Sequence, residues 1–360
     1  MGADRTSARL AETYSIMGLI LGTSGLHRWA TAYQQRATEV ARQTNLPIAM
    51  AYALRPASLH CVEMGEWAKA EECLKVCIEI EDDLGDKRNW GDLLSMLAGV
   101  YAFRGELPRA IEMLAEIAGP RSGSLLHRTL SALWQGGFLL RLGRFDEAIQ
   151  LLKTALELTA DSTDALTMVY SKINAWTYLA AAYLRQEKYP LAREAADTAW
   201  QMIAESKPGA FHLASAFEYI VETYLLLIRT EAVQSDTERQ QMIKAAQALT
   251  RELLRAGSPT IKMRGWHSRG LCQAQSGHLN PAFQSWRKYL AIAERLTMPY
   301  ESGVAHYEIG RHLSKDDPAR QEHLVRAHAL FEQINATYER GQTEAALNQT
   351  QPMMAVTSNV

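Results

Sequence analysis

A glycine-centred segment recurs along the chain at nearly constant spacing, and this repeat restricts the possible folds more than any other feature. Each copy has glycine, any residue, an aromatic residue or leucine, and an alanine five positions after the glycine. The copies are Gly65-Glu66-Trp67 with Ala70, Gly105-Glu106-Leu107 with Ala110, Gly143-Arg144-Phe145 with Ala148, and Gly277-His278-Leu279 with Ala282. The first three glycines are 40 and 38 residues apart, and Gly25 lies another 40 residues upstream. Such spacing predicts a stack of repeats in which each unit packs on its neighbours.

Each glycine lies between two stretches of helical periodicity, so we expect it to adopt the left-handed conformation that ends one helix and leads into the next. The alanine that follows allows two helices to cross closely, because a larger side chain would separate their axes. Small residues also occur one or two turns before each elbow: Gly18, Ser58, Ala98, Gly136, Ala180, Gly270 and Gly310. The predicted repeat unit is therefore a helical hairpin.

One hairpin is expected where the glycine signal is missing. Position 187 carries Glu in place of the elbow glycine, and the next elbow, Gly277, follows 90 residues later. This interval leaves room for one further unit, with helices at about 210–230 and 236–256 and with Ser235 or Asp236 as the helix cap. The sequence thus predicts about eight hairpins, the last ending near Ile334.

The hairpins resemble the tetratricopeptide repeat family. The best single match is Trp176, Leu179-Ala180, Tyr183, Tyr189, Ala192 and Ala199. The resemblance implies an all-α, right-handed superhelical solenoid of about eight hairpins, with units of about 38–45 residues that exceed the standard 34. The expected organisation is a solenoid over residues 1–336, then a short helix and a disordered tail over residues 337–360.

Composition excludes several classes of function. The chain is 47% hydrophobic and 22% charged with a net charge of -2, which gives no electrostatic case for binding nucleic acid. The apolar runs are too short to span a bilayer, and no signal peptide is evident. Four cysteines without CxxC spacing argue against disulfides and zinc. We therefore expect a cytoplasmic protein.

The order of several segments carries a second, more specific resemblance. These segments are residues 81–107, 139–152, 206–227 and 293–336. Together they resemble the C-terminal helical array of bacterial STAND/AAA-type ATPases fused to class III adenylate or guanylate cyclase domains or to Ser/Thr protein kinase domains. The resemblance implies that the repeats sense or restrain the chemistry of upstream domains. The chain itself has no phosphate-binding loop and no paired aspartates after a predicted strand.

No pattern in the sequence indicates catalysis, a cofactor or a metal. Ser122-Gly123-Ser124 lacks the strand-turn-helix setting of a nucleophile elbow. Cys73 and Cys77 fall on an apolar helix stripe, which is typical of buried thiols. The four C-terminal histidines lack the spacing of a helical zinc site; they are His306, His312, His323 and His328. We expect a non-enzymatic protein.

Counting from the small residue of each unit places a set of polar side chains near the concave face of the solenoid: Arg141, Arg185, Arg264, His267, Tyr307 and Arg311. Four arginines in one groove could hold acidic peptide groups or phosphates. Arginine is also favourable at helix C-termini, which offers a structural explanation for Arg141 and Arg185. Trp90 and Trp134 fit the repeat pattern least well and are further candidates for the groove.

The resulting hypothesis is a non-catalytic interaction or regulatory module of a bacterial signalling ATPase, cyclase or kinase system. Its expected partner is a protein or peptide, including its own upstream domains, or a small effector. One alternative is a stand-alone scaffold or self-associating adaptor. A second alternative is a solenoid that uses its concave cavity to bind a small ligand or to act as an enzyme.

Overall fold

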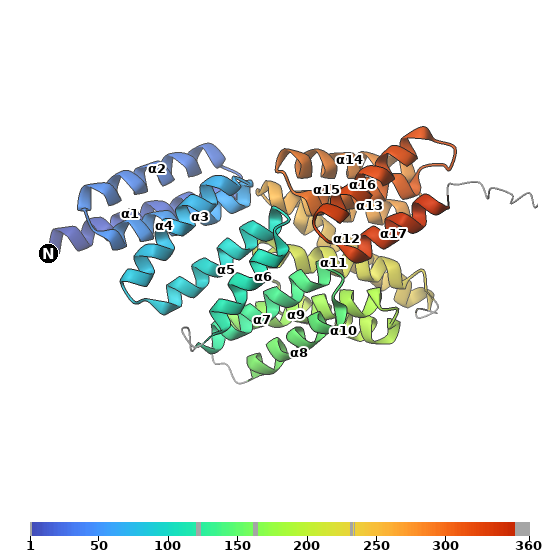
Figure 1. Ribbon diagram of the computed structural model, residues 1–360, viewed down its shortest axis with the longest axis horizontal. Helices are drawn as coiled ribbons and strands as arrows, with labels where there is room; N and C mark the ends of the chain where they lie inside the picture. Colours follow the sequence, from blue (N-terminus) through green and yellow to red (C-terminus); the bar gives the residue numbers. More distant parts are fainter. Residues whose placement is uncertain (1, 120–123, 161–164, 231–232, 234, 350–360) are drawn as a thin grey trace, which may run out of the picture.

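The chain is a superhelical stack of helical hairpins (Figure 1). The computed structural model describes residues 2–119, 124–160, 165–230, 233 and 235–349. Within these ranges it contains seventeen helices and no strand. The all-helical solenoid expected from the repeats is therefore confirmed. The predicted disordered tail beyond residue 349, and Ser122 and Gly123 of the serine-containing connection, lie outside the described residues.

Consecutive helices pair into hairpins, and one further helix follows the last pair. The hairpins are α1 (Gly2–Thr23) with α2 (His27–Thr44), α3 (Pro47–Met64) with α4 (Trp67–Asp83), α5 (Lys87–Phe103) with α6 (Leu107–Ala118), α7 (Leu125–Arg141) with α8 (Phe145–Ala160), α9 (Ala165–Arg185) with α10 (Tyr189–Ser206), α11 (Ala210–Leu227) with α12 (Asp236–Arg255), α13 (Pro259–Gln275) with α14 (Leu279–Arg295), and α15 (Pro299–His312) with α16 (Pro318–Gln333). The last helix is α17 (Thr337–Asn348).

The elbows have the backbone conformation that the repeat predicts. The five elbow glycines have φ between 73° and 84°, and Glu187, which stands in place of the sixth, has φ 59°. They are Gly25, Gly65, Gly105, Gly143 and Gly277. The unit without a glycine signal is confirmed as α11 and α12, and Ser235 is the N-cap residue of α12. Packing explains the small residues as well, because a Cβ atom on Gly136 would lie 2.7 Å from Leu152 of the paired helix.

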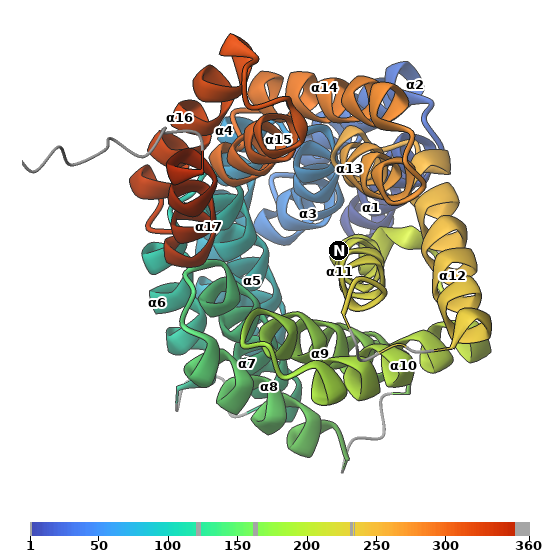
Figure 2. The same ribbon diagram turned by 90° about the vertical axis from the view of Figure 1, so that its right-hand side faces the viewer.

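The stack closes on itself, because the elbows of the early hairpins contact the ends of the late ones. We call this line of contacts the seam. Trp67 donates through Nε1 to the Leu296 carbonyl at 2.5 Å, and Thr337 donates through Oγ1 to the Leu142 carbonyl at 2.8 Å. Ser258 donates to the Glu63 carbonyl at 3.0 Å. In Figure 2 the helices accordingly form a ring, with α12 and α14 on its outside.

The hydrophobic core also crosses the seam. One cluster of buried residues combines side chains from 67–142 with side chains from 263–305, two stretches far apart in the sequence. A second cluster runs through α7 to α13, from Ala132 to Ile261. The ends of α7 and α9 also meet α15 and α17, through the ion pairs of Arg141 with Glu301 and of Arg185 with Glu339. No helix in the described part of the chain has the length and apolar character needed to cross a membrane.

Candidate functional site

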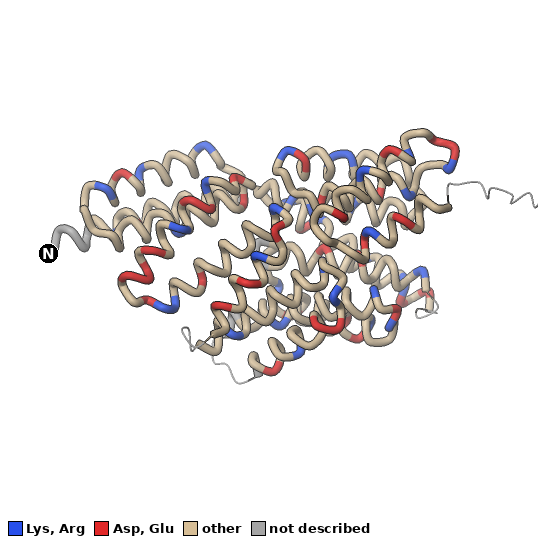
Figure 3. The backbone as a smooth tube through the Cα atoms, viewed as in Figure 1, with Lys and Arg blue, Asp and Glu red and all other residues tan. Residues whose placement is uncertain are grey.

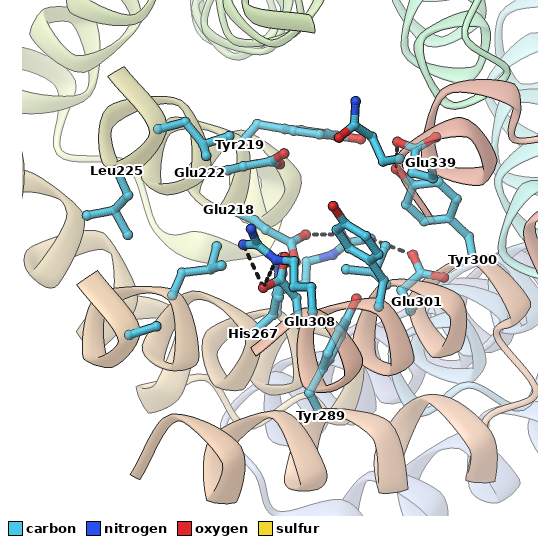
Figure 4. Close-up of a pocket in the computed structure, with 18 of the residues that line it drawn as sticks. Glu218, Tyr219, Glu222, Leu225, His267, Tyr289, Tyr300, Glu301, Glu308 and Glu339 are labelled. Atoms are coloured by element: carbon cyan, nitrogen blue, oxygen red, sulfur yellow. Dashed lines mark hydrogen bonds and ion pairs between the residues drawn. The ribbon is translucent and has the colours of Figure 1, made fainter. Parts of the chain in front are cut away.

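A cavity of about 480 Å³ opens on the inner face of the superhelix. Most of its wall comes from α11, α13, α15 and α17. Arg141 and Arg185, the last residues of α7 and α9, also line it, as do Tyr289 of α14 and Phe331 of α16. The cavity therefore combines residues from both sides of the seam. Figure 4 shows these side chains converging from several helices. A volume of this size is typical of sites for small molecules or short peptide segments.

Buried ion pairs hold one part of the cavity. Glu218 bonds both to Arg264 Nη1 and, through Oε1, to His267 Nδ1 at 2.8 Å. Glu301 accepts a hydrogen bond from Arg141 Nη2 at 3.0 Å, and Arg264 Nη2 lies 3.7 Å from the same oxygen. These five residues are at most 7% exposed. Removing so many charges from water is costly unless they are mutually paired, as they are here.

The protonation states of this cluster follow from its partners. Burial alone would raise the pKa of Glu218, but the charges and hydrogen bonds of Arg264 and His267 outweigh burial and lower it to about 2. Burial alone would lower the pKa of His267, but Glu218 outweighs burial and raises it. Glu218 is therefore an anion at neutral pH, and it favours the imidazolium form of His267.

A second group surrounds Arg185. Its Nη2 atom lies 3.5 Å from Glu222 and 3.4 Å from Glu339, and its guanidinium carbon is 5.5 Å from the ring centres of both Tyr219 and Tyr338. Glu339 also accepts a hydrogen bond from the Tyr300 hydroxyl at 2.9 Å. Burial raises the pKa of Glu339, against the opposing effect of Arg185 and the Tyr300 hydroxyl. These contacts join α9 and α11 to α15 and α17.

Several buried polar atoms of the cavity have no hydrogen-bond partner within the described part of the chain. They are Arg185 Nε, His267 Nε2, Glu301 Oε2 and Glu339 Oε2. Buried polar atoms are satisfied in the great majority of cases, since an unmade hydrogen bond costs about 1–3 kcal/mol. Four such atoms on one cavity indicate a surface suited to a polar ligand.

Another part of the lining is apolar. Leu225, Leu226, Leu271 and Ala274 contribute apolar surface near the ends of α11 and α13. Arg311 pairs with Glu308 at 2.8 Å, while Arg229 is exposed. The cavity therefore has a charged part and an apolar part.

Six of the eight side chains proposed from the sequence line this one cavity: Arg141, Arg185, Arg264, His267, Tyr307 and Arg311. The two tryptophans do not. Trp90 is 4% exposed and belongs to the core around α4–α6, where a large ring fills space between hairpins. Trp134 packs against a core cluster, with its ring centre 6.5 Å from that of Tyr178.

The glutamates of the cavity were not recognised in the sequence, although they equal the lining arginines in number. Five arginines and five glutamates line it, so their formal charges cancel; the glutamates are Glu218, Glu222, Glu301, Glu308 and Glu339. A signal for two of them exists, because Glu218 and Glu222 are one turn apart in an otherwise apolar helix. Arg141 and Arg264 are paired with carboxylates of the chain itself.

Among the described residues, the charges outside the cavity form no large block of one sign. Figure 3 shows basic and acidic residues interspersed along the helices. His306 and His323 face each other with Nδ1 atoms 2.7 Å apart, and burial together with His323 lowers the pKa of His306 to about 4. No group of three or more metal-ligating side chains is placed to hold an ion among the described residues.

Comparisons with known proteins agree with the repeat architecture. Residues 135–166 match the tetratricopeptide repeat family. A search of curated sequences gives no significant match. Among solved structures, apo RapI is 16% identical, with 79% of this chain and 98% of that chain covered and a TM-score of 0.56. A Rap protein complexed with competence and sporulation factor is 12% identical, with 95% and 98% covered and a TM-score of 0.53.

A weaker likeness links the chain to a STAND protein with a tetratricopeptide repeat sensor from Pyrococcus horikoshii. The identity is 12%, the coverage is 89% of this chain and 43% of that chain, and the TM-score is 0.41. At such identities the solved structures bear on the fold alone. One stretch of the chain thus matches the tetratricopeptide repeat family, and the described part as a whole has the architecture of a tetratricopeptide-like helical solenoid.

Proposed function

We propose that the chain is a non-catalytic interaction or regulatory module whose partner or effector enters the cavity between α11 and α17. The observation that carries this proposal is the set of buried, unpartnered polar atoms on the cavity lining. A solenoid that needed only mechanical stability would be served equally well by apolar packing at these positions. The Rap protein solved with competence and sporulation factor has a similar fold.

The position of the cavity gives the module a means of signalling. Arg141 on α7 pairs with Glu301 on α15, and Arg185 on α9 approaches Glu339 on α17. A ligand that competes for these groups changes contacts between distant hairpins, and stacked repeats transmit such changes to their neighbours. We place the module in a bacterial signalling system with ATPase, cyclase or kinase domains, on the strength of the segment order described above.

This proposal is tested by comparing partner capture by the full wild-type chain, whose cavity is open, with capture by a variant whose cavity is filled by a larger side chain. Ala274→Phe places a ring in the cavity from α13, and Ala291→Phe, on the exposed face of α14, is the matched control. We expect a protein or small molecule to be retained by the wild-type chain and by Ala291→Phe but not by Ala274→Phe. Equal retention by all three proteins would contradict the proposal.

The N-terminal hairpin favours a second candidate, a scaffold that self-associates. Six large apolar side chains on or beside α1 and α2 are exposed by 40–63%: Leu10, Ile16, Met17, Ile20, Leu26 and Trp29. Apolar residues gathered on one hairpin often mark an interface. Light scattering separates this candidate from the first: Ile20→Glu would dissociate a dimer formed through this hairpin and leave capture at the cavity intact.

A further inference from the structure

A carboxyl group is buried at the seam, away from the cavity. Glu63, in the last turn of α3, is 9% exposed, and its Oε2 atom has no hydrogen-bond partner within the described residues. Its main-chain carbonyl accepts hydrogen bonds from Ser258 Oγ at 3.0 Å and from Thr260 Oγ1 at 3.2 Å, at the start of α13. Ser258 and Thr260 are themselves only 2% and 8% exposed. Glu63 therefore lies in a closed contact between an early hairpin and a late one.

The hydroxyl groups on the other side of this contact are already engaged. A serine or threonine hydroxyl donates a single hydrogen bond. Ser258 donates to the Glu63 carbonyl, and Thr260 bonds to that carbonyl and to Ser258 Oγ, which is 2.9 Å away. An ionised Glu63 carboxylate would have to compete with the main chain for these protons, whereas a protonated carboxyl has a donor of its own.

The charged groups of the adjoining elements do not compensate an ionised Glu63. Those at the nearby helix ends are paired with one another: Glu66 with Lys69 at 2.9 Å, Arg104 with Glu71 at 2.7 Å, and Arg255 with Glu252 at 2.7 Å. Lys262, further along α13, makes no ion pair with Glu63 within the described part of the chain.

The histidines near this end of α3 do not supply the missing charge either. His60 lies one turn before Glu63 and is 8% exposed, and its ring centre is 6.2 Å from that of His27 on α2. Burial and the neighbouring His27 lower the pKa of His60, so its imidazole is neutral at pH 7. Glu63 is thus a buried acid whose ionised form has no counter-ion in the described structure.

This setting fixes the sign of a pH dependence. Burial raises the pKa of Glu63 to about 7, and the Ser258 hydroxyl offsets only part of the shift. When the seam separates, Glu63 meets water and regains the ordinary glutamate pKa of about 4.3. Closure of the seam is therefore most favourable below about pH 4.3, and it weakens as the pH rises from there to about 7.

We propose that Glu63 is a proton-binding site that controls closure of the seam. Its protonated carboxyl permits the close contact of α3 with α13, and its ionisation loosens that contact. Acidification from neutral pH therefore tightens the ring of helices. This device is separate from the cavity and does not depend on what binds there.

Amide hydrogen exchange in α3 and α4 tests the proposal, because local opening of these early hairpins requires the seam to separate. Rates are corrected for intrinsic exchange at each pH, and the wild-type chain is compared with Glu63→Gln, which stays neutral throughout. From pH 5 to pH 7.5 we expect the wild-type rate, relative to that of the variant, to rise at least about tenfold. In α9 and α10 this ratio should stay constant.

Glu79→Gln is the matched control, because Glu79 is an exposed carboxylate on α4. The ratio of wild type to this variant should not change with pH. A constant or falling ratio for Glu63→Gln overturns the proposal. If Glu63→Gln does not fold, a carbon-13 magnetic resonance titration of the Glu63 carboxyl in the wild-type chain decides. A midpoint above about pH 6 supports the proposal, and a lower midpoint overturns it.

Discussion

At the scale of single residues, the cavity depends on carboxylates that set the charge state of their neighbours. His267 is buried and stacked on Tyr289, with ring centres 4.9 Å apart, an environment that favours the neutral imidazole. Glu218 reverses this preference by its hydrogen bond and charge. The side chain that decides the state of His267 is therefore on another helix, α11.

We predict that Glu218→Gln reverses the direction of the His267 pKa shift. In the wild-type protein the pKa of His267 lies above the ordinary value of 6.5; in the variant, burial prevails and the pKa falls below it. Nuclear magnetic resonance titration of the His267 ring protons measures both values. An unchanged His267 pKa in the variant would show that Glu218 is not the cause.

The pKa shifts of Glu218 and His267 also predict how the stability of the folded protein depends on pH. Glu218 has a pKa of about 2 in the folded protein and about 4.3 in an unfolded chain, so its contribution is present above pH 4.3 and is lost as pH falls toward 2. His267, with its raised pKa, contributes fully below pH 6.5 and loses its contribution as pH rises through the folded value.

Glu218→Gln should therefore destabilise the protein by about 3 kcal/mol at pH 5–6, because it leaves Arg264 partly unpaired. The difference from wild type should narrow on acidification, since protonated Glu218 resembles glutamine. Melting temperatures of both proteins from pH 6 to pH 3 measure the effect. A difference that stays constant over this range would contradict the assigned pKa.

At this scale much of the site is predictable from the sequence, but the pairing of its charged side chains is not. Register along a helix is local, so counting from each small residue found Arg141, Arg264 and Arg311. Which glutamate meets which arginine depends on the pitch of the superhelix, which brings Glu301 to Arg141 from 160 residues away. No single hairpin contains that information. Trp90 was a candidate for the groove, but it lies in the core. The repeat pattern does not account for a large ring at this position, and such a ring fits a core between hairpins as well as it fits a groove.

At the scale of helices and elbows, glycine has two separable roles. Gly143 and Gly277 have nearly the same conformation, with φ 76° and 77°. A Cβ atom on Gly277 would meet nothing within 4 Å, whereas on Gly143 it would lie 2.2 Å from Thr337 Oγ1 across the seam. At both elbows the left-handed backbone conformation favours glycine. At Gly143 the close contact across the seam also leaves no space for a larger side chain.

Gly143→Ala should therefore be more harmful than Gly277→Ala. The left-handed conformation costs an alanine about 1–2 kcal/mol at either elbow. At Gly143 the clash with Thr337 adds about 1–3 kcal/mol. Chemical denaturation of both variants measures the two values, and Gly277→Ala serves as the control for the backbone effect. Equal losses of stability would show that the elbow of α7 and α8 does not pack against α17.

Helix boundaries were predictable for the same local reasons. Elbow glycines, cap residues and apolar periodicity placed the hairpins, including α11 and α12, where the elbow signal is absent. The role of α17 was not visible, because its contacts with Leu142 and Phe145 join parts of the chain 195 and 193 residues apart, as Thr337 and Tyr338 show. Long-range contacts of this kind leave no periodic pattern in the sequence.

At the scale of the whole molecule, the seam changes how the solenoid unfolds. In an open array each repeat contacts only its neighbours, so the terminal units unfold first and separately. Here Trp67 and Ser258 bond across the seam, and one hydrophobic cluster contains both sides. The seam therefore couples the stability of the early hairpins to that of the late ones.

We predict that Trp67→Phe with Ser258→Ala uncouples the two halves. Amide hydrogen exchange in α3 and α4 should become at least about tenfold faster, since two seam hydrogen bonds of about 1 kcal/mol each are lost, while exchange in α9 and α10 stays unchanged. Mass spectrometry of exchange along the chain measures this. Val76→Ala, at an exposed position on α4, is the control. Unchanged protection of α3 would contradict the coupling.

The seam also fixes how many repeats the protein tolerates. The elbow of Trp67 meets Leu296, and Leu142 meets Thr337, so each early hairpin has one assigned late partner. If a hairpin were inserted or deleted between an early elbow and its late partner, every later hairpin would move by one unit along the superhelix. The early elbows would then face surfaces that do not complement them. An open solenoid lengthens or shortens one repeat at a time during evolution. This chain can change without loss only at its ends, so its repeat number is as constrained as the strand number of a closed barrel.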